Sequence, residues 1–146
     1  MYEFIVDVHS ILRYLVLVLL IIVIGQSIAG LTSKKPFKES NRKMALLTMV
    51  SFHIQFLFGI VLFFTSPKVI FDTMTMKSAL LRFFALEHPL LMIIAIILIT
   101  LGYLKARKRN APSSYRILLI YGLIVLLLLM MGIPWPFRET LGVGWI

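Results

Sequence analysis

Four long runs of apolar residues alternate with short polar connections along the chain. They cover residues 14–31, 44–65, 88–104 and 117–137. Each run is close to the roughly 20 residues that a helix needs to cross the hydrocarbon core of a bilayer. The pattern therefore predicts an all-α integral membrane fold, in which four transmembrane helices form an up-down bundle and residues 1–146 make a single domain.

The connection between the second and third runs carries a pattern of its own. Apolar residues at positions 69–71, 74, 80–81 and 83–84 are interrupted by charged residues at 68, 72, 77 and 82. This mixture predicts a short amphipathic helix that lies on the outer membrane surface. Pro89 follows at the start of the third run, where it either occupies a first helical turn or kinks a helix that began at Ser78.

Composition supports the membrane assignment, and the distribution of charge predicts how the chain is oriented across the membrane. The chain is 60% hydrophobic with a mean hydropathy of +0.99, which is far too apolar for an ordinary soluble domain. Ten of the fifteen basic residues fall in or beside the first and third connections: Lys34, Lys35, Lys38, Arg42, Lys43, Lys105, Arg107, Lys108, Arg109 and Arg116. The positive-inside rule places these connections in the cytoplasm and both termini outside. Because the net charge of +9 is sorted by loop, no nucleic-acid partner is expected.

The absence of cysteine narrows the chemistry. Without a thiol, the chain has no disulfide, thiolate metal site, covalently attached c-type haem or iron–sulfur cluster. The remaining side chains suited to a metal or cofactor are three histidines. His9 and His88 each stand near the outer end of an apolar run, and His53 lies inside the second run, near the middle of the membrane.

His9 and His88 are the favoured pair. In an up-down bundle the first and third helices are diagonally opposed, and facing side chains in bundle cores hold cofactors. Two histidines at one level can clamp haem b, whose propionates require cations. Arg13, Arg82 and Arg138 are all predicted on that outer side.

Neighbouring residues suggest further roles at this site. Asp7 and Glu87 are candidates to orient the two imidazoles through their second ring nitrogens. The last helix is almost wholly aliphatic and is expected to be structural.

His53 remains the alternative ligand. It is expected about 10 Å deeper in the membrane than His88, counted at about 1.5 Å per helical residue. If it is not axial, it could bond a propionate, bind a quinone carbonyl or relay protons. A metal site built from the three histidines and carboxylates ranks third, because no two histidines lie at ligand spacing within one helix.

Three short motifs carry a resemblance to a known family. Val8-His9-Ser10-Ile11-Leu12-Arg13-Tyr14, Phe52-His53-Ile54-Gln55-Phe56-Leu57-Phe58-Gly59 and Glu87-His88-Pro89 resemble those of the small four-helix membrane cytochromes b of bacteria. The chain is also distantly similar to half of a haem A synthase-type bundle. The resemblance implies bis-histidine haem b and electron transfer. The catalytic activity of haem A synthase is not implied, since this chain has four spans and no histidine in the fourth.

The resulting expectation is a b-type cytochrome of the bacterial inner (cytoplasmic) membrane. It would pass electrons between a quinone or a membrane dehydrogenase and an acceptor, working with a membrane redox partner or a second copy of itself rather than as a stand-alone enzyme. Two other classes stay open. One is a non-haem accessory subunit of a larger membrane complex, and the other is a small metal or proton transporter that uses His53.

Overall fold

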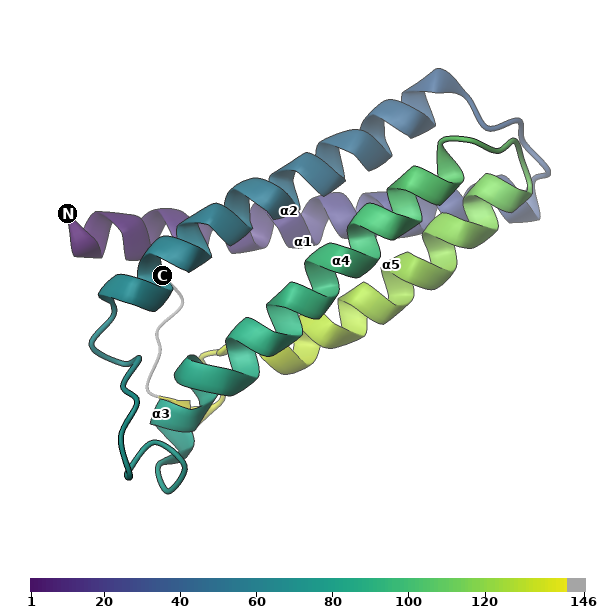
Figure 1. Ribbon diagram of the computed structural model, residues 1–146. Helices are drawn as coiled ribbons and strands as arrows, with labels where there is room; N and C mark the ends of the chain where they lie inside the picture. Colours follow the sequence, from purple (N-terminus) through teal and green to yellow (C-terminus); the bar gives the residue numbers. More distant parts are fainter. Residues whose placement is uncertain (142–146) are drawn as a thin grey trace.

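Four long helices make up most of the structure. The computed structural model describes residues 1–141, and these contain helices and their connections but no strand (Figure 1). The elements are α1 (Tyr2–Thr32), α2 (Glu39–Thr65), α3 (Ala79–Arg82), η1 (Phe83–Glu87), α4 (His88–Ala106), α5 (Ser113–Gly132) and η2 (Glu139–Leu141). The helical stretches Tyr2–Thr32, Glu39–Thr65, Ala79–Ala106 and Ser113–Gly132 are long and apolar enough to cross a membrane. The chain is therefore a multi-pass membrane protein, and the predicted all-helical, four-span architecture is confirmed.

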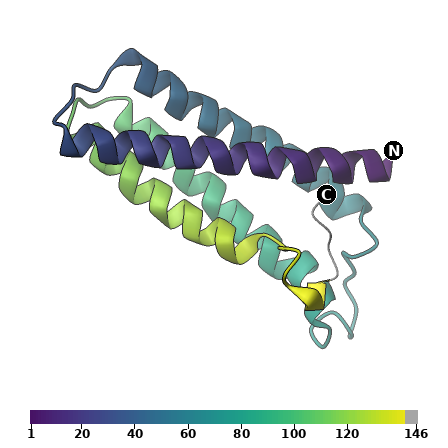
Figure 2. The same cartoon turned by 180° about the vertical axis from the view of Figure 1, so that it is seen from behind.

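The helices are arranged as two pairs, α1 with α2 and α4 with α5. Further contacts join α1 to α5 and α2 to α4, so α1 and α4 lie on a diagonal of the bundle. The pairs approach each other at the end formed by residues 33–38 and 107–112, here named the basic end. They diverge toward the opposite end, which carries the N-terminus and residues 66–78 and is here named the histidine end (Figures 1 and 2).

The bundle core is made of small and branched apolar side chains. Val16, Leu20 and Ile24 recur every four residues on α1 and pack against Val125 and Leu129 of α5. Lipid tails are as apolar as these side chains, so the helices associate through close packing and not through exclusion from water. The large apolar residues on the outer helix faces remain exposed in the isolated chain, which is the arrangement that lipid contact requires.

The third spanning stretch starts earlier than the hydropathy pattern suggests. The helix begins at Ala79, where the Ser78 hydroxyl accepts a hydrogen bond from the Leu81 N–H, and α3, η1 and α4 follow one another without a break. Residues 66–78 form turns instead of the expected separate amphipathic helix. Asp72 accepts hydrogen bonds from the backbone N–H groups of Met74 and Thr75. Such side-chain bonds compete with helical ones and favour turns.

Pro89 accounts for the wider π-helical turn η1. Within this turn, the His88 N–H donates to the carbonyl of Phe83, five residues earlier. A proline inside a helix has no N–H to donate and its ring crowds the carbonyl four residues before it, here that of Ala85. The wider turn accommodates both effects, and it carries His88 at its exit.

Close packing at the basic end gives a testable prediction for Gly30. A Cβ atom at this position would overlap the ring of Tyr115, which is 3% exposed and whose hydroxyl donates to the Pro36 carbonyl at 3.0 Å. We expect Gly30→Ala to lower the free energy of unfolding by about 1–3 kcal/mol, the usual cost of overpacking. Denaturant titration in detergent micelles measures this change.

Gly25→Ala is the matched control, because nothing lies within 4 Å of a Cβ atom at that position in the same helix. It should leave stability unchanged or raise it, since alanine favours helix over glycine. Equal destabilisation by both substitutions would contradict the close approach of α1 and α5 at Gly30.

Candidate functional site

His9 of α1 and His88 of α4 face each other across the diagonal of the bundle. Their ring centroids are 6.3 Å apart and their planes are inclined at 77°. Imidazoles that share one metal ion through bonds of about 2 Å have ring centroids about 6 Å apart when the ion lies between them. The structure thus brings together the two histidines that the sequence pairs, at a spacing suited to one shared ion.

A backbone carbonyl holds the imidazole of His88. Its Nδ1 lies 2.6 Å from the carbonyl oxygen of Gly132, the last residue of α5. Because a carbonyl oxygen only accepts hydrogen bonds, Nδ1 carries the proton and Nε2 keeps its lone pair. Histidines that bind metals commonly donate their other ring N–H in this way, which fixes both the tautomer and the ring orientation.

The sequence at the end of α5 explains why this carbonyl is available. A helical carbonyl normally accepts from the N–H four residues later, and for Gly132 that residue is Pro136, which has no N–H. Pro134 likewise leaves the carbonyl of Met130 without its helical donor. This carbonyl accepts a hydrogen bond from the indole Nε1 of Trp135 at 3.0 Å. The two prolines thus free carbonyls for side chains, and one of these side chains is His88.

Gly132 also provides space for this contact. A Cβ atom at its position would lie 2.5 Å from Cε of Met92 and 3.3 Å from Cβ of Leu91. A larger residue here would require the Met92 side chain to move and Leu91 to give by a few tenths of an ångström. The last helix, which is expected to be structural, thus also supplies the carbonyl that holds the His88 ring.

His9 is placed by two residues of α2. Gln55 Nε2 donates to the backbone carbonyl of His9 at 2.9 Å, and a Cβ atom at Gly59 would lie 3.4 Å from Cε1 of the His9 ring. Gln55 and Gly59 are one helical turn apart and therefore share a face of α2. This face positions the first histidine of the pair.

Two buried polar atoms stand beside this contact. His9 Nδ1 and Gln55 Oε1 have no hydrogen-bond partner among residues 1–141. Buried groups without a partner are uncommon in folded proteins and cost about 1–3 kcal/mol each. Unsatisfied imidazole and amide atoms at one place are typical of a site that binds an additional group.

Arg13 brings positive charge next to the histidine pair. It lies one turn beyond His9 on α1 and is only 8% exposed. Its guanidinium carbon is 4.7 Å from the centre of the Tyr14 ring, and its NH2 group donates to the Tyr14 hydroxyl at 3.1 Å. Arg13 thus places a buried guanidinium within one helical turn of the histidine pair.

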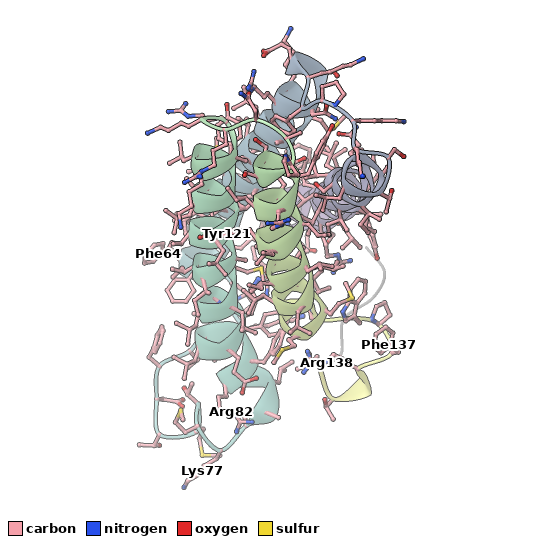
Figure 3. The ribbon with its side chains drawn as sticks, turned by 90° about the vertical axis from the view of Figure 1, so that its right-hand side faces the viewer. Phe64, Lys77, Arg82, Tyr121, Phe137 and Arg138 are labelled. Carbon is pink, nitrogen blue, oxygen red and sulfur yellow. The ribbon has the colours of Figure 1, made fainter. Side chains whose placement is uncertain are left out.

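The other two arginines lie at the same end of the bundle but in different surroundings (Figure 3). Arg82 forms an ion pair with Glu87, with 2.7 Å between Nε and Oε1, so its charge is already balanced. The guanidinium of Arg138 lies 4.9 Å above the ring of Phe83, whose centroid is 5.9 Å from that of His88. The Phe83 ring thus contacts both Arg138 and His88.

The proposed carboxylate partners of the imidazoles are wrong. Glu87 pairs with Arg82, and the nitrogen of His88 that it was expected to bind is bonded to Gly132. Asp7 is exposed on α1. For His88, the backbone carbonyl of Gly132 takes the place of the expected acid.

His53 stands apart from the pair. It is exposed on α2, its Nδ1 lies 2.8 Å from the carbonyl of Met49, and its Nε2 lies 3.5 Å from the Thr100 hydroxyl. His53 lies two positions before Gln55 on α2. On an ideal helix this rotates its side chain by about 200°, away from the face that holds His9. The structure therefore does not bring His53 to the other two histidines.

The donor set defines what the site can bind. Residues 1–141 hold no group of three or more His, Asp or Glu side chains suited to a metal ion, so the three-histidine metal centre is not formed. Two imidazoles beside a buried cation suit a metal ion whose other ligands belong to a bound cofactor and not to the protein.

No family model, no curated protein sequence and no solved structure matches this chain.

The His88–Gly132 hydrogen bond predicts a defined tautomer. We expect the ¹⁵N NMR spectrum of labelled protein in micelles to show His88 protonated at Nδ1, because its acceptor is a carbonyl oxygen. Replacing His88 by Gln assigns its signals by their disappearance. Protonation at Nε2 instead would contradict the orientation described above.

Proposed function

We propose that His9 and His88 are the axial ligands of a haem b iron and that the chain is a membrane cytochrome. It would carry electrons between a quinone or a membrane dehydrogenase and an acceptor. The observation that carries this proposal is the 6.3 Å separation of the two rings, together with the carbonyl-bound Nδ1 of His88. Both features match the requirements of an imidazole pair on one iron.

Each residue of the site has a defined task in this function. His9 and His88 would each offer a ring nitrogen to the iron, and the Gly132 carbonyl would keep His88 in the tautomer that this requires. Arg13, which is 8% exposed, would be the cation beside the carboxylate groups of a bound haem. Phe83, which is 1% exposed, covers His88 on the side of Arg138 and excludes water from the ring.

The number of histidines supports electron transfer over other haem chemistry. A bound haem b supplies reversible one-electron chemistry. When two imidazoles occupy both axial positions, no position remains for oxygen or a substrate. The chain therefore suits passage of electrons between partners, with a quinone as the candidate membrane-soluble one.

The orientation in the membrane follows from the basic residues. The basic end faces the cytoplasm and the histidine end faces outward, with both termini on the outer side of a bacterial inner membrane. Lys34, Lys35, Arg107, Lys108 and Arg109 are all exposed at the basic end, as anchoring cations at an interface should be. The histidine pair then lies near the outer leaflet.

Absorption spectroscopy tests the cofactor and its ligands. Protein expressed with ample haem should show a Soret band and, after reduction with dithionite, a sharp α-band of low-spin haem b. His9→Ala and His88→Ala should each remove the low-spin spectrum and weaken haem binding at least about tenfold, because even partners behind a ligand contribute that much. His53→Ala is the matched control and should retain the spectrum.

Two results would count against this assignment. Protein without any haem absorption, despite ample haem, would exclude a cytochrome. Unchanged low-spin spectra in both His9→Ala and His88→Ala would exclude this pair as ligands. Loss of the spectrum in His53→Ala with retention in His9→Ala would point to the alternative ligand.

Single cysteines test the orientation, because the chain has none of its own. Lys77→Cys, in the connection at the histidine end, should react with a membrane-impermeant maleimide in spheroplasts with intact inner membranes. Lys35→Cys, at the basic end, should react only after the membrane is permeabilised. The reverse pattern would invert the proposed topology.

A further inference from the structure

A groove at the basic end lies outside the histidine site. It runs between the first turns of α2 and the end of α4 and has a volume of about 440 Å³. Four cations line it, Arg42 and Lys43 from α2 with Arg107 and Lys108 from beyond α4, against one carboxylate, Glu39. Elements distant in sequence thus gather an excess of positive charge at one place.

Arg42 is held in place by several contacts. Its NH2 group donates to the carbonyl of Arg109 at 3.4 Å, and its guanidinium carbon lies 5.6 Å from the centre of the Phe37 ring. Its Nε atom is buried and has no hydrogen-bond partner among residues 1–141. Arg42 is therefore a positioned cation and not a freely moving surface side chain.

The acidic residue leaves most of this charge unbalanced. Glu39 lies 3.7 Å from Arg42 in a largely exposed ion pair, the kind that is only weakly stabilising. On the other wall, the Arg107 guanidinium lies 5.7 Å from the centre of the Tyr103 ring, and both residues line the groove. Lys43 and Lys108 are exposed and can approach a bound anion from either side.

The walls of the groove continue into apolar surface. Leu46 and Tyr103 also line it. One turn farther along each wall, Val50 follows Leu46 on α2 and Leu104 precedes Lys108 on α4, and these two side chains are 41% and 37% exposed. A ligand that fills the groove therefore meets cations at one end and hydrocarbon-facing residues at the other, which distinguishes an amphiphile from a free anion.

We propose that this groove binds the phosphate headgroup of an anionic phospholipid, whose acyl chains lie along α2 and α4. Basic pockets between transmembrane helices at the cytoplasmic side are suited to such headgroups, and each Lys or Arg near the surface adds to the attraction. The site joins the helix pairs α1/α2 and α4/α5, since its cations come from both. It is independent of the proposed haem function.

Native mass spectrometry of the full chain in detergent tests the site. The protein is mixed with phosphatidylglycerol or with phosphatidylcholine at equal concentration. Wild type should retain one phosphatidylglycerol in preference to phosphatidylcholine. Arg107→Gln/Lys108→Gln should lower the retained fraction at least about tenfold, given the contribution of each cation, and Lys43→Gln should lower it less.

Lys35→Gln/Arg116→Gln is the matched control, because it removes the same charge from exposed residues of the basic end that do not line the groove. It should bind phosphatidylglycerol as wild type does. Equal loss in this control, or equal retention of both lipids by wild type, would overturn the proposal. Displacement of the lipid by millimolar inorganic phosphate would also overturn it, because the groove would then select a free anion.

Discussion

The end of α5 supplies the constraint on which the histidine pair depends. A helix leaves its last carbonyls without partners, and in a membrane these oxygens must be satisfied inside the protein. Pro134 and Pro136 remove the N–H groups that could have served, so the carbonyls of Met130 and Gly132 accept from Trp135 and His88 instead. The position of His88 is therefore set as much by two prolines some 45 residues later as by its own helix.

The two ends of the bundle differ, because the basic end is closely packed and the histidine end holds the polar side chains of the candidate site. At the basic end, glycine and buried aromatic side chains allow close approach, as where Gly30 of α1 faces Tyr115 of α5. At the histidine end, the helix pairs diverge (Figure 2), and the His9 ring of one pair contacts the His88 ring of the other. A rigid, tightly packed end can hold the other end open without strain in the helices. This division explains how a small bundle can be stable and still receive an additional group.

Much of this arrangement could be predicted from the sequence, and what could not has identifiable causes. Run lengths predict the four spans, and chain order predicts the diagonal that pairs His9 with His88. The third apolar run begins only at His88 because Arg82 and Glu87 look like surface charges, but they neutralise each other, and the helix begins at Ala79, in agreement with the alternative start at Ser78. The roles of Gly132, Gln55 and Gly59 depend on contacts between helices, and hydropathy carries no information on such contacts. Only the role of Gly132 has a signal in the sequence, namely the two prolines that follow it.

The π-helical turn η1 acts as a one-residue insertion in an otherwise regular rod. One extra residue rotates everything before it by about 100° relative to α4. With η1 present, Phe83 lies against His88 and Arg82 reaches Glu87. In evolutionary terms, loss of a single residue between 83 and 87 would restore a plain helix and change the register of α3 against the site. The length of this turn is thus as much a part of the site as the identity of its residues.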